Sequence, residues 1–92
     1  MKRDMAETLA LQALGWIAGQ DDLFGQFMNA TGASRDDLRE QAGNAHFLGA
    51  VLDFILMEDD RVLRFAEAAG VAPTSPGQAR QALPGGETPH WT

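Results

Sequence analysis

Residues 51–70 read VLDFILMEDDRVLRFAEAAG, and this stretch decides the fold because it contains two amphipathic helices joined by an acidic turn. Residues 13–32, ALGWIAGQDDLFGQFMNATG, repeat its pattern at a constant offset without a gap. Such self-similarity is the signature of an internal repeat, so we predict a helix–turn–helix unit that is used twice. The identical aligned pairs are Leu14/Leu52, Ile17/Ile55, Asp21/Asp59, Asp22/Asp60, Phe27/Phe65, Ala30/Ala68 and Gly32/Gly70.

Each predicted unit buries one aromatic side chain from each of its two helices. Within a unit, we expect Trp16 to pack on Phe27, and Phe54 to pack on Phe65. The Asp-Asp pair between the helices is expected to cap the second helix, since carboxylates at a helix start accept hydrogen bonds from free backbone N–H groups. A short third helix follows each unit, which predicts two three-helix halves packed on each other.

Hydrophobic periodicity along the whole chain predicts an all-α fold, a compact bundle of five to six short helices. The 45–57 helix is apolar nearly all round and is expected to form the centre of the fold. Residues 1–83 are predicted to be a single helical domain, and residues 84–92 a C-terminal tail that folds back. The expected helices cover 5–18, 23–31, 35–42, 45–57, 61–69 and 76–83, with Asp4, Ser34, Asn44 and Ser75 as further caps.

The composition restricts the function classes. The chain of 92 residues has no cysteine, which removes disulfides and thiol chemistry and favours a cytoplasmic location. Its net charge of −6 disfavours nucleic-acid binding, which depends on neutralising phosphates. The longest apolar run, residues 47–57, is too short to span a membrane and is interrupted by Asp53.

The sequence offers little catalytic or metal-binding chemistry. His46 and Asp53 share one face of the 45–57 helix, but two helical turns, about 10 Å, separate them. Two histidines and no cysteine make a transition-metal site improbable. Ser34 and Ser75 are interpreted as helix caps and not as nucleophiles. We therefore predict no catalytic residue, no metal and no cofactor, and a protein that is not an enzyme.

Candidate interaction residues lie at the C-terminus and on the central helix. Trp91, within the tail Pro89-His90-Trp91-Thr92, is expected to fold back onto the helices or to contact a partner. With His90 and Pro89 it forms the preferred candidate surface, and the exposed face around His46 and Asp53 is the second. Three methionines lie on apolar faces: Met5, Met28 and Met57. We expect them to pack in the core, and a methionine-rich binding groove is the alternative.

Three segments, HFLGAVLDFILMEDDRVLRFAEAAGVAP, ALQALGWIAG and LPGGETPHWT, resemble an uncharacterised family of small bacterial proteins that is known only as a domain of unknown function. The resemblance covers nearly the whole chain and implies an all-helical fold. It carries no activity, cofactor or catalytic residue. It also suggests a signalling partner, a receiver-domain response regulator.

Two functions remain open from the sequence. The preferred one is a non-enzymatic helical module for protein–protein interaction or an adaptor, with another protein as partner and no nucleic acid or membrane. The alternative is a small-molecule or peptide sensor with a pocket between the two helical halves. A homo-oligomer is compatible with either.

Overall fold

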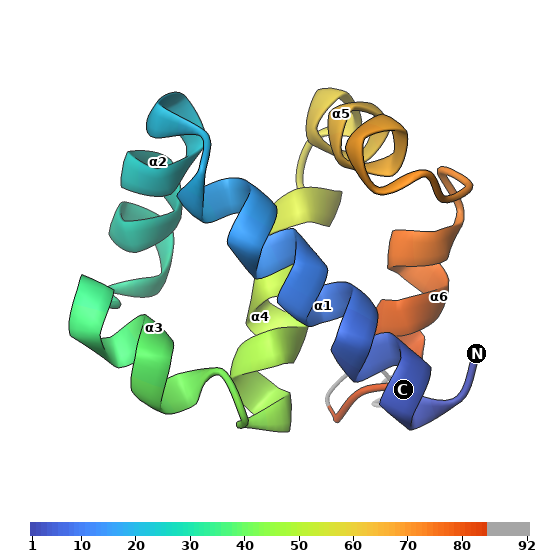
Figure 1. The fold of residues 1–92 in the computed structure, drawn as a ribbon, viewed down its shortest axis with the longest axis horizontal. Coiled ribbons are helices and arrows are strands. Elements are labelled where there is room, and N and C mark those ends of the chain that lie inside the picture. Colours follow the sequence, from blue (N-terminus) through green and yellow to red (C-terminus); the bar gives the residue numbers. More distant parts are fainter. Residues whose placement is uncertain (85–92) are drawn as a thin grey trace, which may run out of the picture.

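The structure, a computed structural model, describes residues 1–84 of the chain (Figure 1). The predicted all-α fold is confirmed over this range, which contains helices and no strand. Three helices begin two residues earlier than the hydrophobic pattern indicates, because polar residues make up their first turns. The helices are α1 (Arg3–Ala18), α2 (Asp21–Thr31), α3 (Arg35–Gln41), α4 (Ala45–Leu56), α5 (Asp59–Ala69) and α6 (Ser75–Gln81).

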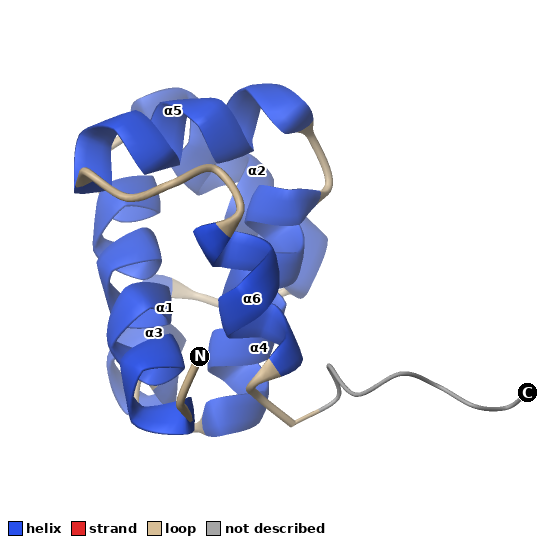
Figure 2. Cartoon of the chain, turned by 90° about the vertical axis from the view of Figure 1, so that its right-hand side faces the viewer, coloured by secondary structure: helices blue, strands red, loops and turns tan. Residues whose placement is uncertain are grey.

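The core forms around α1 and α4, which pack against each other and each contact α2, α5 and α6. The expectation that residues 45–57 form the centre is therefore correct, although α1 shares that position. Figure 2 shows α6 between α1 and α4, with α5 lying across one end of the bundle. The largest fully buried side chains are Phe27, Phe65, Ile17, Leu48, Leu52, Ile55, Leu83, Val51 and Pro76.

The aromatic pairs expected within each half are wrong, because the two halves exchange them. The ring of Trp16 lies 5.7 Å from that of Phe65, and the ring of Phe27 lies 5.3 Å from that of Phe54. The physical reason is that α1 and α4 pack together, so each presents its aromatic side chain to the second helix of the other half. Both exchanged contacts join equivalent positions of the proposed repeat, but the duplication itself stays a prediction.

The expected caps of α2 and α5 are also wrong. Both helices begin at the first aspartate of their Asp-Asp pair, after Gln20 and Glu58, whose side chains make no cap hydrogen bond. The aspartates lie in the first turn, where their negative charge favours the positive end of the helix dipole. Each of these helices ends at a left-handed glycine, Gly32 with φ 72° and Gly70 with φ 70°.

The other predicted caps divide into two groups. Ser34 and Asp37 form a reciprocal capping box at the start of α3, and the side chain of Asn44 accepts hydrogen bonds at the start of α4. Asp4 and Ser75 are not caps, because α1 already begins at Arg3 and α6 begins at Ser75 itself. At Asp4 the side chain instead accepts a hydrogen bond from the neighbouring Met5 N–H.

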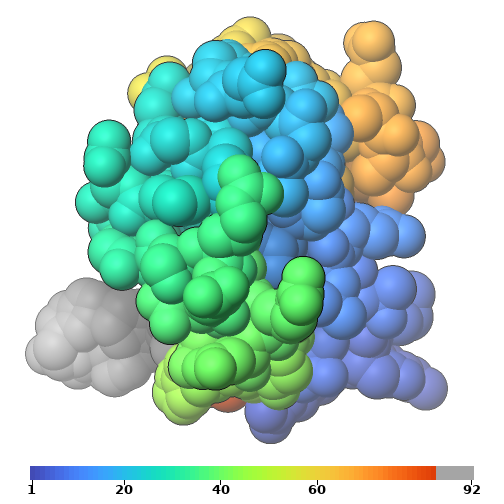
Figure 3. Space-filling view, turned by 60° about the vertical axis from the view of Figure 1, so that its left-hand side comes forward, coloured from blue at the N-terminus to red at the C-terminus, as the bar shows by residue number. Residues whose placement is uncertain are grey.

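The two short third helices differ in how they pack. The side chain of Arg80 fixes α6, since Nε donates to Asp53 Oδ1 at 2.6 Å and Nη1 donates to the Pro84 carbonyl at 3.0 Å. The guanidinium lies over Gly49, where an added Cβ would lie 2.8 Å from Nη1. By contrast, α3 makes no comparable packing against another helix, and Figure 3 shows it at the surface.

Candidate binding groove

One flank of α1 is left uncovered by the other helices. Met5, Thr8, Gln12 and Trp16 follow one another at intervals of three or four residues, so they share this flank. Two hollows lie along it, with volumes of about 370 and 360 Å³. Both include Gln12, so they adjoin along α1, and we refer to the two together as the groove. The first is lined by Met1, Asp4, Met5, Thr8, Leu9, Gln12, Val71 and Ser75, and the second by Gln12, Trp16, Phe65, Ala68 and Ala69.

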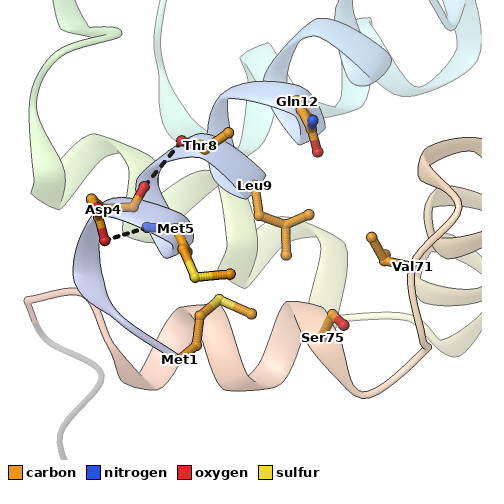
Figure 4. A pocket seen from close by; sticks show the side chains of 8 residues that line it. All are labelled: Met1, Asp4, Met5, Thr8, Leu9, Gln12, Val71 and Ser75. Atoms are coloured by element: carbon orange, nitrogen blue, oxygen red, sulfur yellow. Dashed lines mark hydrogen bonds between the residues drawn. The ribbon is translucent and has the colours of Figure 1, made fainter.

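The first hollow has a largely apolar wall. Met1 is 47% exposed and Met5 is 59% exposed. Figure 4 shows these two side chains and Leu9 extending into the space between α1 and α6, with Val71 and Ser75 on its far side. The expectation that Met5 packs in the core is therefore wrong, because no helix covers this flank near the start of α1.

Two polar side chains of the first hollow, those of Asp4 and Thr8, are engaged in local hydrogen bonds. Asp4 Oδ1 accepts from the Met5 N–H at 2.9 Å, and Thr8 Oγ1 donates to the Asp4 carbonyl at 3.0 Å. These bonds leave the methionine and leucine side chains as the main contact surface. Asp4 adds a negative charge at the edge, and neither hollow has a lysine or arginine in its lining.

The second hollow continues the groove toward the end of α1. Its wall contains Trp16, which is half-buried, and Phe65, which is buried. The Arg64 guanidinium lies 5.6 Å from the centre of the Trp16 ring system. Arg64 also forms ion pairs with Asp22 at 3.6 Å and Asp60 at 3.5 Å, so neighbouring carboxylates balance its charge.

The corresponding flank of α4 is closed. Phe47 occupies the position equivalent to Leu9, and its ring packs edge-on against Phe27 at 6.0 Å. The ring of Phe54, equivalent to Trp16, is 3% exposed and lies under the Arg61 guanidinium at 3.9 Å. Arg61 donates from Nη1 to the Phe54 carbonyl, and this further closes the surface.

The residues predicted from the sequence do not line this groove. His46 is exposed in the first turn of α4, and Asp53 is exposed but held by Arg80. Their role as an interaction surface stays a prediction. Pro89, His90 and Trp91, the preferred candidates, lie outside the described residues. Of the three methionines in the alternative methionine-rich groove, only Met5 lines the observed groove, and Met57 is 69% exposed elsewhere. Leu9 is buried as expected at 6% exposure, but its contribution to the wall of a hollow, like that of Val71, was not predicted.

The chemistry of the described residues is that of a contact surface. Within residues 1–84, no group of three or more His, Cys, Asp or Glu side chains is placed to hold a metal ion. In the same range, every buried side-chain nitrogen or oxygen has a hydrogen-bond partner. None of the helices described has the length and apolar character that crossing a membrane requires. The groove offers apolar contacts with a few polar groups at its edge.

Together these features define a small helical domain with an apolar groove along its first helix. The chain belongs to the family described as "Protein of unknown function (DUF3572)", whose model matches residues 3–86. The match includes all the helices described above, and it confirms the resemblance to a domain of unknown function. Pro89, His90 and Trp91 lie beyond it. No curated protein and no solved structure matches the chain.

Proposed function

We propose that this protein is a non-enzymatic interaction module whose groove along α1 binds an amphipathic helix of another protein. The observation that carries the proposal is the exposed apolar flank of α1, where Met5 is 59% exposed beside a hollow of about 370 Å³. Large apolar side chains that share one recess gain free energy when a partner removes them from water.

The dimensions of the groove support a helical partner. The two hollows extend along α1, whose 16 residues correspond to a length of about 24 Å at 1.5 Å per residue. A helix of similar length would place apolar side chains at intervals of three and four residues along it, as in other helix-in-groove complexes. Methionine side chains adapt their shape to such anchors because they are unbranched and polarizable.

The charge distribution supports a basic partner. The chain has a net charge of −6, Asp4 lies at the edge of the first hollow, and the lining contains no basic side chain. A partner helix with apolar residues on one face and lysine or arginine on its flanks would complement both properties. Such complementarity raises the association rate and disfavours acidic partners.

Fluorescence anisotropy tests the proposal with a labelled, synthetic 18-residue helix that carries leucine on one face and lysine on the other. Met5→Lys should weaken binding of this probe at least about tenfold, since it places an ammonium group in the apolar wall and loses about 1.4 kcal/mol or more. Met57→Lys is the matched control, because Met57 is 69% exposed and lies outside the groove. It changes the net charge equally and should alter the affinity less than about twofold. Equal effects of the two substitutions would contradict the proposal.

The volume of the first hollow favours the sensor as a second candidate. The hollow lies between α1 of the first half and the Val71–Ser75 region of the second, and its volume of about 370 Å³ lies within the usual range for small-molecule sites. A panel of metabolites would separate the candidates. A sensor predicts a ligand that raises the Tm of the wild-type protein but not of Met5→Lys, whereas a helix-binding module predicts no such ligand.

An adaptor role in signalling, with a response regulator as partner, rests on the family resemblance alone and stays a prediction. Co-purification from the native host would test it. We also infer a cytoplasmic location, which the cysteine-free composition supports. Self-association is tested by measuring the molar mass over a range of protein concentrations.

A further inference from the structure

We propose that the C-terminal segment of this same chain, residues 85–92, docks in the first hollow and places Trp91 against Met5 and Leu9. The segment has the sequence GGETPHWT and follows Pro84, the last residue that the structure describes. Its docking would cover Met1 and Met5, which line the hollow and whose side chains are exposed to solvent. The segment would thus be an intramolecular ligand of the groove.

The segment starts close to α6, the helix whose first residue lines the hollow. Arg80 Nη1 donates to the Pro84 carbonyl at 3.0 Å, which holds the end of the described chain against α6. At the other end of α6, Ser75 lines the hollow. The seven residues of α6 cover only about 10 Å, so the whole hollow lies near the point from which the segment departs.

The segment is long enough to reach the hollow. Trp91 is the seventh residue after Pro84, and seven residue steps in an extended conformation span up to about 25 Å. This reach is more than twice the length of α6, so it allows for a reversal of the chain. Gly85 and Gly86 suit that reversal, because glycine adopts conformations that other residues avoid.

The chemistry of the hollow suits a tryptophan. Thioether sulfurs make favourable contacts with aromatic rings, and Met1 and Met5 both extend into this space (Figure 4). Leu9 and Val71 complete an apolar wall for the ring system. Polar groups at the edge, among them Gln12 and Ser75, are available to the indole N–H, which usually finds a partner when it is buried.

Docking has a regulatory consequence that rests on the proposed function. The segment and the partner helix would compete for the same surface, so a partner would bind only the undocked fraction of the chain. If about 90% of the molecules were docked, removal of residues 85–92 would strengthen binding of the partner about tenfold. The docking itself does not depend on the existence of such a partner.

The test uses the fluorescence of Trp91 in the Trp16→Phe variant of the full chain, in which Trp91 is the single tryptophan. Phenylalanine occupies the equivalent position in the second half, so this substitution conserves an aromatic ring. We expect blue-shifted emission and protection from quenching by iodide. Adding Met5→Lys should abolish both signals, and adding Met57→Lys should leave them unchanged. Circular dichroism verifies that each variant is folded.

Two outcomes would overturn the docking. One is a folded protein in which Trp91 is as accessible to iodide as in the urea-unfolded chain. The other is protection that disappears on dilution, which would assign the docked segment to a second copy. Failure of the proposed function gives a different result: Trp91 is protected, but the synthetic helix binds neither the full chain nor the chain that lacks residues 85–92.

Discussion

Trp16 and Phe54 are aligned with each other in the proposed repeat, yet Trp16 borders an open groove and Phe54 lies in a closed core. Each ring contacts the second helix of the opposite half, at 5.7 Å for Trp16 and 5.3 Å for Phe54. Each also has an arginine above it, Arg64 and Arg61 respectively. Nevertheless Phe54 is 3% exposed, whereas Trp16 is only half-buried.

The two helices also differ two turns earlier, where α1 has Leu9 and α4 has Phe47. In α4, the ring of Phe47 packs against Phe27, which also contacts the ring of Phe54. In α1, Leu9 is 6% exposed, has no ring and lines the first hollow. We infer that the smaller side chain at this position of α1 contributes to the hollow beside that helix.

A second difference concerns the third helices. Arg80 of α6 covers Gly49 of α4, which has no side chain in the way. The equivalent position of α1 is Leu11, which is 44% exposed. A leucine there would obstruct a helix docked as α6 is on α4, and α3 makes no comparable contact with α1. Glycine at one position accompanies a third helix that packs closely on α4 and α1, whereas α3 contributes mainly Leu38 to the core.

The largest expected effect tests whether the two halves contribute equally to the core. Phe27→Ala and Phe65→Ala should each lower the free energy of unfolding by about 3–5 kcal/mol, because both rings are fully buried and each truncation leaves a cavity. Phe54→Ala should lie in the same range. Urea denaturation measures these losses. A loss below about 1 kcal/mol at any of the three positions would show that the core is assigned wrongly.

A smaller effect tests the role of Phe47 in closing the second half. Phe47→Leu should cost about 1–2 kcal/mol, because it removes the ring that packs on Phe27 and leaves part of its volume empty. Leu9→Phe is the reciprocal change, and it should fill the first hollow and weaken binding of the synthetic helix without loss of stability. The comparison fails if Phe47→Leu is neutral, or if Leu9→Phe binds the helix as tightly as the wild type does.

The smallest effect tests the contact between α4 and α6. Gly49→Ala should stabilise an Arg80→Ala background by about 1 kcal/mol, since alanine favours the helix more than glycine does. In the wild-type background, Gly49→Ala should stabilise the protein by a smaller amount, because the new methyl group displaces the Arg80 guanidinium from Asp53. A double-mutant cycle by thermal denaturation measures the difference. Equal gains in both backgrounds would show that Arg80 does not require the space at Gly49.

The sequence predicts the helices well and the contacts between them less well. Helical periodicity and the glycines that end α2 and α5, Gly32 and Gly70, are local signals, so they place most helix ends within two residues. Trp16 contacts Phe65 and Phe27 contacts Phe54 because of the way α1 and α4 pack. Local sequence patterns do not specify that packing. Each ring was correctly expected to pack against another aromatic ring, but the half that supplies the partner was not predicted, and Trp16 is only half-buried.

The groove was harder to predict because it depends on residues from distant parts of the chain. Met5 resembles a core residue in the periodicity of α1, and its exposure follows from the absence of a helix on that flank. Val71 lies in a loop, and its contribution depends on how α5 and α6 are connected. The composition indicated a contact surface, but the location of that surface required the packed structure.

We infer above that the groove along α1 is the surface that binds a partner helix. Nuclear magnetic resonance of methyl-labelled methionines in the full chain tests it most directly, with the basic synthetic helix as titrant. Met5 lies in the groove, whereas Met28 lies on α2 and Met57 follows α4. The account predicts that the Met5 methyl signal shifts on saturation while those of Met28 and Met57 stay in place. Saturable binding that shifts Met28 or Met57 and leaves Met5 unchanged would contradict it.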